Sequence, residues 1–181
     1  MKKILTLISS IILVMGLCSC GGGGGLFAKP TPTPIPEISP EDILPAAEVK
    51  EFVDYEPVKD GDVTNENNTK TVVYVSDPIG KYDSVTVKLT QFGDNFSKDD
   101  VWNLYDGGRI KRSSAKMVDG IGTDAYIAFP SIHIYDKGCA ITISAGSGSD
   151  SGQESLLKRL GERAVLNLGK YIASDSEEQK Q

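Results

Sequence analysis

The chain has 181 residues and a formal net charge of −6 at pH 7, from 25 acidic and 19 basic residues. An acidic chain lacks the clustered Lys and Arg that displace counterions from phosphates, which excludes nucleic acid as a partner. Anionic lipid headgroups repel the same charge, which argues against a membrane-binding face on the folded part.

Residues 1–19 have the composition of an export signal. Lys2 and Lys3 form a positive start, and residues 4–17 form an apolar run. These 14 residues are fewer than the roughly 20 that a membrane-spanning helix needs. The pattern therefore predicts a cleaved signal peptide.

The leader ends in Leu17-Cys18-Ser19-Cys20, which resembles the lipobox of bacterial lipoproteins: Leu, a tolerant position, a small residue and then Cys. The resemblance implies cleavage between Ser19 and Cys20 and transfer of diacylglycerol to the Cys20 sulfur. We therefore expect a protein on the extracytoplasmic face of the cell membrane, held by acyl chains on Cys20. The alternative is an ordinary secretory signal with incidental cysteines. Either way, loss of Lys2 and Lys3 leaves 17 basic residues against 25 acidic ones, a formal charge of −8.

Residues 20–39 predict a disordered tether between this cysteine and the folded part. Gly21 to Gly25 is flexible, and the alternating prolines from Pro30 to Pro36 favour an extended polyproline II spacer. About twenty extended residues, at about 3 Å each, span up to about 60 Å. We expect one folded domain over residues 40–173. The last residues, 174–181, contain no apolar side chain and predict a disordered tail.

The first predicted element is a helix over Glu41–Val53, with Ser39 or Asp42 as its cap and Pro45 within its first turn. A polar stretch, residues 60–68, follows it and invites comparison with a calcium loop. Asn65 stands where such a loop needs Gly, and the position of the bidentate Glu holds Thr71. We therefore expect a polar surface loop there, and neither a metal site nor a cofactor.

The rest of the chain predicts strands and two more helices. Val85, Val87 and Leu89 alternate with polar residues, as expected of a strand with one buried face. Ser97, with Asp100 three residues later, predicts a helix start. The predicted strands are Thr71–Val75 and Ser84–Leu89, which form a hairpin, then Ala125–Phe129, Ile132–Tyr135 and Cys139–Ala145; the helices are Lys98–Tyr105 and a final one with Leu157, Leu160, Ala164, Leu168 and Tyr171/Ile172 on one stripe. This order predicts an α+β fold, with about three helices packed mainly on one face of an antiparallel sheet.

Two segments resemble small lipid-anchored proteins of Gram-positive bacteria that carry a domain of unknown function. One is Val118–Tyr126 followed by a turn at residues 136–138, and the other is Asp42–Val49. The resemblance implies a compact α/β domain, similar in plan to the PsbP-like group, and it implies no catalytic residues. The residues themselves indicate that Gly120 and Gly122 form a backbone turn. A phosphate-binding loop needs a helix after its glycines, and here a strand follows.

Few side chains suggest chemistry. Cys139 shares a strand face with Ile141 and Ile143, so we expect it to be buried. His133 is the only histidine, and it alternates to the face opposite its isoleucine neighbours. Together with Tyr126 and Tyr135 it forms a possible contact patch on one sheet surface.

The leading hypothesis is a non-catalytic, lipid-anchored module that binds another envelope protein or a small ligand. Two alternatives remain open. One is an envelope hydrolase that uses acidic residues such as Asp94, Asp99, Asp119 and Asp124, since only their separation in space decides whether carboxylates pair. The other is a structural protein of the cell envelope.

Overall fold

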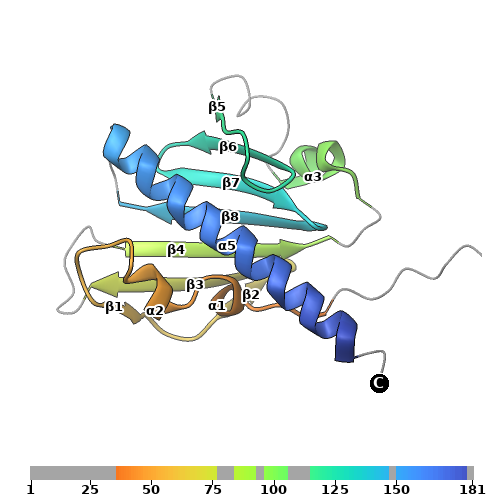
Figure 1. Ribbon diagram of the computed structural model, residues 1–181, viewed down its shortest axis with the longest axis horizontal. Helices are drawn as coiled ribbons and strands as arrows, with labels where there is room; N and C mark the ends of the chain where they lie inside the picture. Colours follow the sequence, from red (N-terminus) through yellow and green to blue (C-terminus); the bar gives the residue numbers. More distant parts are fainter. Residues whose placement is uncertain (1–35, 77–83, 93–95, 106–114, 147–149, 179–181) are drawn as a thin grey trace, which may run out of the picture. The chain divides into compact units, whose positions relative to one another are not determined.

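The computed structural model describes residues 36–76, 84–92, 96–105, 115–146 and 150–178. In this part the chain builds an eight-stranded antiparallel sheet with helices packed on it (Figure 1). The strand order is β1-β3-β4-β8-β7-β6-β5, and β2 pairs with β3 outside this path. The prediction of an α+β fold with an antiparallel sheet is confirmed.

The bounds of the elements follow. The strands are β1 Pro57–Lys59, β2 Thr64–Glu66, β3 Thr69–Ser76, β4 Ser84–Gln91, β5 Lys116–Met117, β6 Asp124–Ala128, β7 Ser131–Asp136 and β8 Cys139–Ala145. The helices are α1 Pro40–Ile43, α2 Ala46–Val49, α3 Lys98–Tyr105 and α5 Ser151–Glu178.

Strand β4 lies in the interior of the sheet, beside the middle strand β8, and contributes to the main core. It pairs with β3 on one side and with β8 on the other, so that Val87 lies between Val72 and Ile143. The alternation predicted for this strand is confirmed, because Val85, Val87 and Leu89 are all buried on one face. The predicted β3–β4 hairpin is confirmed too, and its turn lies outside the described residues.

Helix α5 covers this face of the sheet and runs diagonally across it (Figure 1). Leu157, Leu160 and Leu168 are fully buried, as the predicted stripe requires. A Cβ atom at Gly161 would lie 2.9 Å from Cδ1 of Ile134, so the missing side chain lets the helix approach β7 closely. Helices α1 and α2 pack on the same face and contribute Ile43 and Val49 to the core.

The opposite face carries the helix α3. Val101 of this helix packs with Tyr126, Tyr135 and Ala140 in a second, smaller cluster. The described part therefore has four helices on two faces, where the sequence predicted about three mainly on one. The bounds predicted for α3 are confirmed, and Ser97 and Asp100 cap its start through reciprocal hydrogen bonds.

The first predicted helix is wrong as a single element. It forms two short helices, separated at Leu44 and Pro45. Ser39 caps α1, and its backbone N–H donates to Asp42 Oδ2 at 2.8 Å. Pro45 has no N–H to donate and precedes α2 as its N-cap, because the chain leaves the helical path at Leu44.

The polar stretch before β3 contains a strand where the sequence predicted a loop. Thr64–Glu66 forms β2 and pairs with the start of β3. Asn67 and Asn68 make the turn, with φ angles of 52° and 61°. Asn tolerates this left-handed backbone better than most residues, so an Asn-Asn pair can replace the glycine usual in such turns.

The folded domain is longer at both ends than the sequence predicted. It already includes residues 36–39, and Ile38 is completely buried. Helix α5 continues to Glu178, five residues past the predicted domain end at 173. None of the helices in the described part combines the length and apolar character needed to cross a membrane.

Candidate functional site

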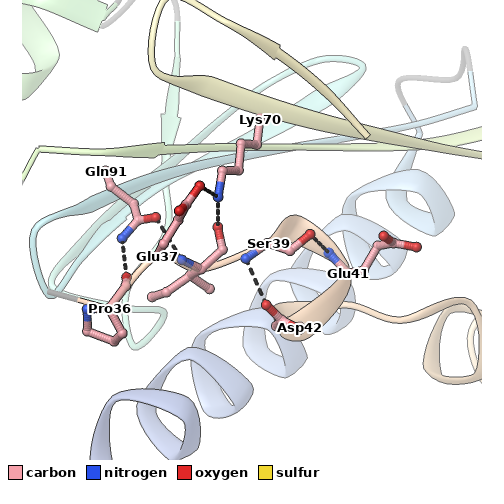
Figure 2. Close-up of polar contacts among 8 residues, drawn as sticks. Pro36, Glu37, Ser39, Glu41, Asp42, Lys70 and Gln91 are labelled. Atoms are coloured by element: carbon pink, nitrogen blue, oxygen red, sulfur yellow. Dashed lines mark hydrogen bonds and ion pairs between the residues drawn. The ribbon is translucent and has the colours of Figure 1, made fainter. Parts of the chain in front are cut away.

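The segment that enters the domain is fixed to the sheet by the side chain of Gln91, the last residue of β4. Its Oε1 accepts a hydrogen bond from the backbone N–H of Ile38 at 2.9 Å, and its Nε2 donates to the carbonyl of Pro36 at 2.7 Å (Figure 2). The amide thus satisfies two backbone groups as a neighbouring strand would. It holds Ile38 in place over the core.

Lys70, near the start of β3, holds the same segment from the other side. Its ammonium donates to the carbonyl of Ile38 at 3.1 Å and pairs with the Glu37 carboxylate at 2.8 Å. The hydrogen bond and charge of Lys70 hold the pKa of Glu37 below its usual value. We call Lys70 and Gln91, with residues 36–38, the tether clamp.

A pocket of about 280 Å³ opens at the other end of β4. The turn after α2, the start of β4, the end of β8 and the first turns of α5 supply its walls. The lining residues are Phe52, Val53, Asp54, Tyr55, Ser84, Val85, Ala145, Gly146, Gln153 and Leu156. We call this the β4 pocket.

Most polar groups around the β4 pocket are already used within the fold. The backbone N–H of Gly146 donates to the carbonyl of Ser84 at 3.3 Å, and the side-chain amide of Gln153 donates to the carbonyl of Ala145. Asp54 differs, because its exposed carboxylate has no ion-pair or hydrogen-bond partner among the described residues. It is also the one charged residue among the described residues of the lining.

The pocket and the tether clamp lie at opposite ends of one strand. Ser84, the first residue of β4, lines the pocket, and Gln91, its last residue, belongs to the clamp. Eight residues of antiparallel strand, at about 3.4 Å each, place the two roughly 24 Å apart. The tether segment therefore enters the domain at the end away from the pocket.

The structure brings the predicted contact patch together but covers most of it. Tyr126 and His133 are paired across β6 and β7, and their rings stack with centroids 4.6 Å apart. Tyr126 is completely buried, and Tyr135 is only 9% exposed and donates a hydrogen bond to the carbonyl of Phe96 at 2.8 Å. His133 is half-buried, with its Nδ1 3.1 Å from the hydroxyl of Thr142. These aromatic residues mainly support the α3 side of the sheet.

The described acidic residues proposed for a hydrolase fall into two groups: one is on α3, and the other flanks a single turn that the Val118 N–H closes by donating to the carbonyl of Ala125 at 3.0 Å. Asp99 lies on α3, Asp119 in the turn before β6, and Asp124 at the start of β6. Asp94 lies outside the described residues, as do Ser19 and Cys20. Within the described part no group of three or more His, Cys, Asp or Glu side chains could hold a metal ion.

Two smaller predictions are confirmed. Cys139 is fully buried on the core face of β8. Gly120 and Gly122 both have positive φ angles, +80° and +62°, in the turn before β6. A Cβ atom at Gly122 would lie 2.8 Å from the Ile134 side chain and 3.0 Å from the carbonyl oxygen of Tyr135, so the backbone of β7 also requires glycine there.

Sequence reasoning missed both the tether clamp and the β4 pocket. One signal for the clamp was present, because Gln91 continues the inward alternation of Val85, Val87 and Leu89 with a polar residue. The pocket lining comes from separated segments and leaves no local pattern. Comparison of the chain with protein-family models, with curated proteins and with solved structures gave no match.

Proposed function

We propose that this protein is a lipid-anchored extracytoplasmic binding module that presents the β4 pocket away from the membrane. The observation that carries this proposal is the placement of the pocket and the tether clamp at opposite ends of β4. Acyl chains on Cys20 are the proposed anchor. A tether that leaves the domain at Pro36 then directs the far end of the sheet, with its pocket, toward the surroundings.

The clamp supports this orientation because it removes a hinge at the junction of tether and domain. Gln91 and Lys70 together bond to Pro36, Glu37 and Ile38. A chain that met the domain through an unattached loop would let it turn freely. Here Pro36, Glu37 and Ile38 are bonded to the side chains of two strands, so this part of the chain is fixed to the domain.

The pocket supports binding more directly than catalysis. Hydrolysis by paired carboxylates needs two of them about 5 to 10 Å apart, and the described residues of the pocket lining include a single carboxylate, that of Asp54. Six of the other described lining residues are apolar or aromatic, as is usual for sites that hold a small ligand or a protruding side chain. The resemblance to small lipoproteins of Gram-positive bacteria points the same way and stays a prediction.

The anchor is tested by the Cys20→Ala substitution. We expect the wild-type protein to take up labelled fatty acid and to remain with membranes, because two or three acyl chains hold a protein stably. The variant should lose the label and leave the membrane fraction. The proposed anchor would be wrong if the Cys20→Ala protein stayed membrane-bound and the wild-type protein took up no label.

The pocket is tested by photo-crosslinking in living cells from position 54, with position 62 as the matched control. Both positions hold exposed aspartates, and only Asp54 lines the pocket. We expect a defined neighbour to be captured from position 54 alone, and we expect Ser84→Phe, which fills the pocket, to abolish that capture. Equal capture from both positions would argue for a general envelope role without a binding site.

A further inference from the structure

We propose that the β4 pocket takes a small ligand, or a partner's side chain, with an apolar body and one cationic amino group. Asp54 would be the counter-ion of that group. This inference names the ligand class of the proposed binding function and rests on it. It is drawn from the size of the pocket, its charge and its aromatic walls.

The volume and the walls set the size of the ligand and its apolar part. At about 280 Å³ the pocket lies just below the range of about 300 to 1,000 Å³ common for small-molecule sites. Val53, Val85 and Leu156 give aliphatic walls, and Phe52 and Tyr55 give aromatic ones. A single ring or a branched aliphatic group fits such a space, and a nucleotide or an oligosaccharide does not.

The charge of the lining sets the sign of the ligand. Among the described lining residues Asp54 is the one that carries a charge, and in the described part of the chain no cation pairs with it. An ammonium group bound to this carboxylate would gain a charge-assisted hydrogen bond, whereas a carboxylate ligand would be repelled. The net charge of −6 of the whole chain acts in the same direction.

Two basic residues of α5, Arg159 and Arg163, contact the Phe52 ring and do not belong to the lining. Arg163 is paired with Glu51 at 2.8 Å and with Glu48 at 3.5 Å. Arg159 lines a separate groove along α5, although its guanidinium lies 4.8 Å from the centre of the Phe52 ring. Neither arginine lines the β4 pocket.

The aromatic walls favour a cation as well. Aromatic rings attract cations through the negative charge of their faces. Phe52 already makes such contacts with Arg159 and Arg163, at 4.8 and 5.3 Å from its centre. Because the Phe52 ring already contacts two guanidinium groups, Tyr55 is the aromatic wall that can add to the discrimination provided by Asp54.

The test uses the whole chain in nanodiscs, with empty nanodiscs as the reference, and compares two probes of similar shape by ligand-observed NMR. The probes are 2-phenylethylammonium and 3-phenylpropanoate. We expect saturable binding of the amine and about tenfold or weaker binding of the acid. Asp54→Asn should weaken amine binding about tenfold, since a charged hydrogen bond is lost. Asp62→Asn, an exposed control outside the pocket, should leave it unchanged.

Three results would overturn the inference: equal binding of amine and acid, amine binding that Asp54→Asn does not weaken, or no saturable binding of the amine. Ser84→Phe adds a check on location, because it should abolish amine binding while circular dichroism shows an intact fold. If the amine fails to bind but crosslinking from position 54 still captures a pocket-dependent neighbour, the binding function stands and only the ligand class is wrong.

Discussion

The two ends of β4 use their polar groups in opposite ways. At the clamp end, Gln91 and Lys70 bond to the backbone of the incoming segment, and Ile38 beneath them is completely buried. At the pocket end, the side chains leave a cavity of about 280 Å³, and Asp54 has no partner among the described residues. One strand therefore has hydrogen-bonded clamp residues at one end and an open pocket at the other. A substitution should cost stability at the first end and binding at the second.

Ile38→Ala, at the clamp end of β4, should have the largest effect on stability. Removing a fully buried Ile side chain should lower the free energy of unfolding by about 3 kcal/mol, measured by urea denaturation. Val58→Ala, at an exposed position, serves as the control and should change it by less than about 0.5 kcal/mol. A loss below about 1 kcal/mol for Ile38→Ala would mean that residues 36–39 do not belong to the cooperative fold.

Gln91→Ala tests the clamp without emptying the core. It leaves the N–H of Ile38 and the carbonyl of Pro36 without their partner, which should cost about 2 kcal/mol in the same measurement. Hydrogen exchange of the Ile38 amide should accelerate as well. Lys88→Ala, an exposed change on the opposite face of the same strand, should have neither effect. Unchanged exchange at Ile38 would show that the clamp bonds do not hold the segment.

Tyr74→Phe should have a smaller effect on stability than the two substitutions at the clamp end. The hydroxyl of this buried residue donates to the carbonyl of Leu44 at 2.9 Å, so its removal should cost about 1 kcal/mol at neutral pH. Burial, and secondly the charge of Glu41, raise the pKa of Tyr74 above its usual value.

Because the pKa of Tyr74 is raised in the folded state, its neutral hydroxyl contributes to the free energy of unfolding below pH about 10. This contribution is lost as the pH rises further. The wild type should therefore lose more stability than Tyr74→Phe above pH about 10, when urea midpoints are compared across pH. Parallel losses in the two proteins would contradict this.

Asp54→Asn should have the smallest effect on stability. An exposed carboxylate without a partner in the described structure contributes little to folding, so the free energy of unfolding should change by less than about 0.5 kcal/mol. The same variant should bind the amine about tenfold more weakly, as expected if this end of β4 serves binding and the other end serves stability. A loss above about 1 kcal/mol would make Asp54 a structural residue and would remove the contrast.

The parts of the fold that could be predicted from the sequence are those with a local pattern. The alternation in β4 marked its buried face, and Ser97 with Asp100 marked the start of α3. Gly120 and Gly122 marked a turn that needs positive φ angles. Each of these features depends on residues within a few positions of one another.

The parts that could not be predicted depend on contacts between distant segments. Ile38 is the one buried residue between Pro36 and Ser39, too few for a periodic signal, and its place is decided by Gln91, 53 positions away. Proline chemistry alone suggested that the tether extends through residue 39. Likewise, α5 continues through polar residues to Glu178 because a helix already packed through Leu168 needs no further apolar stripe to propagate.

The interior position of β4 has a mechanical consequence. If the protein is pulled between its tether and something held in the β4 pocket, the share of the load that passes through the Gln91 side chain runs along β4. Seven residue pairs join this strand to β3 and seven join it to β8. Force along a strand loads these ladders in shear, so many hydrogen bonds must yield together, whereas peeling would break them one at a time. The clamp and the pocket are thus joined by a strand whose two ladders would be loaded in shear.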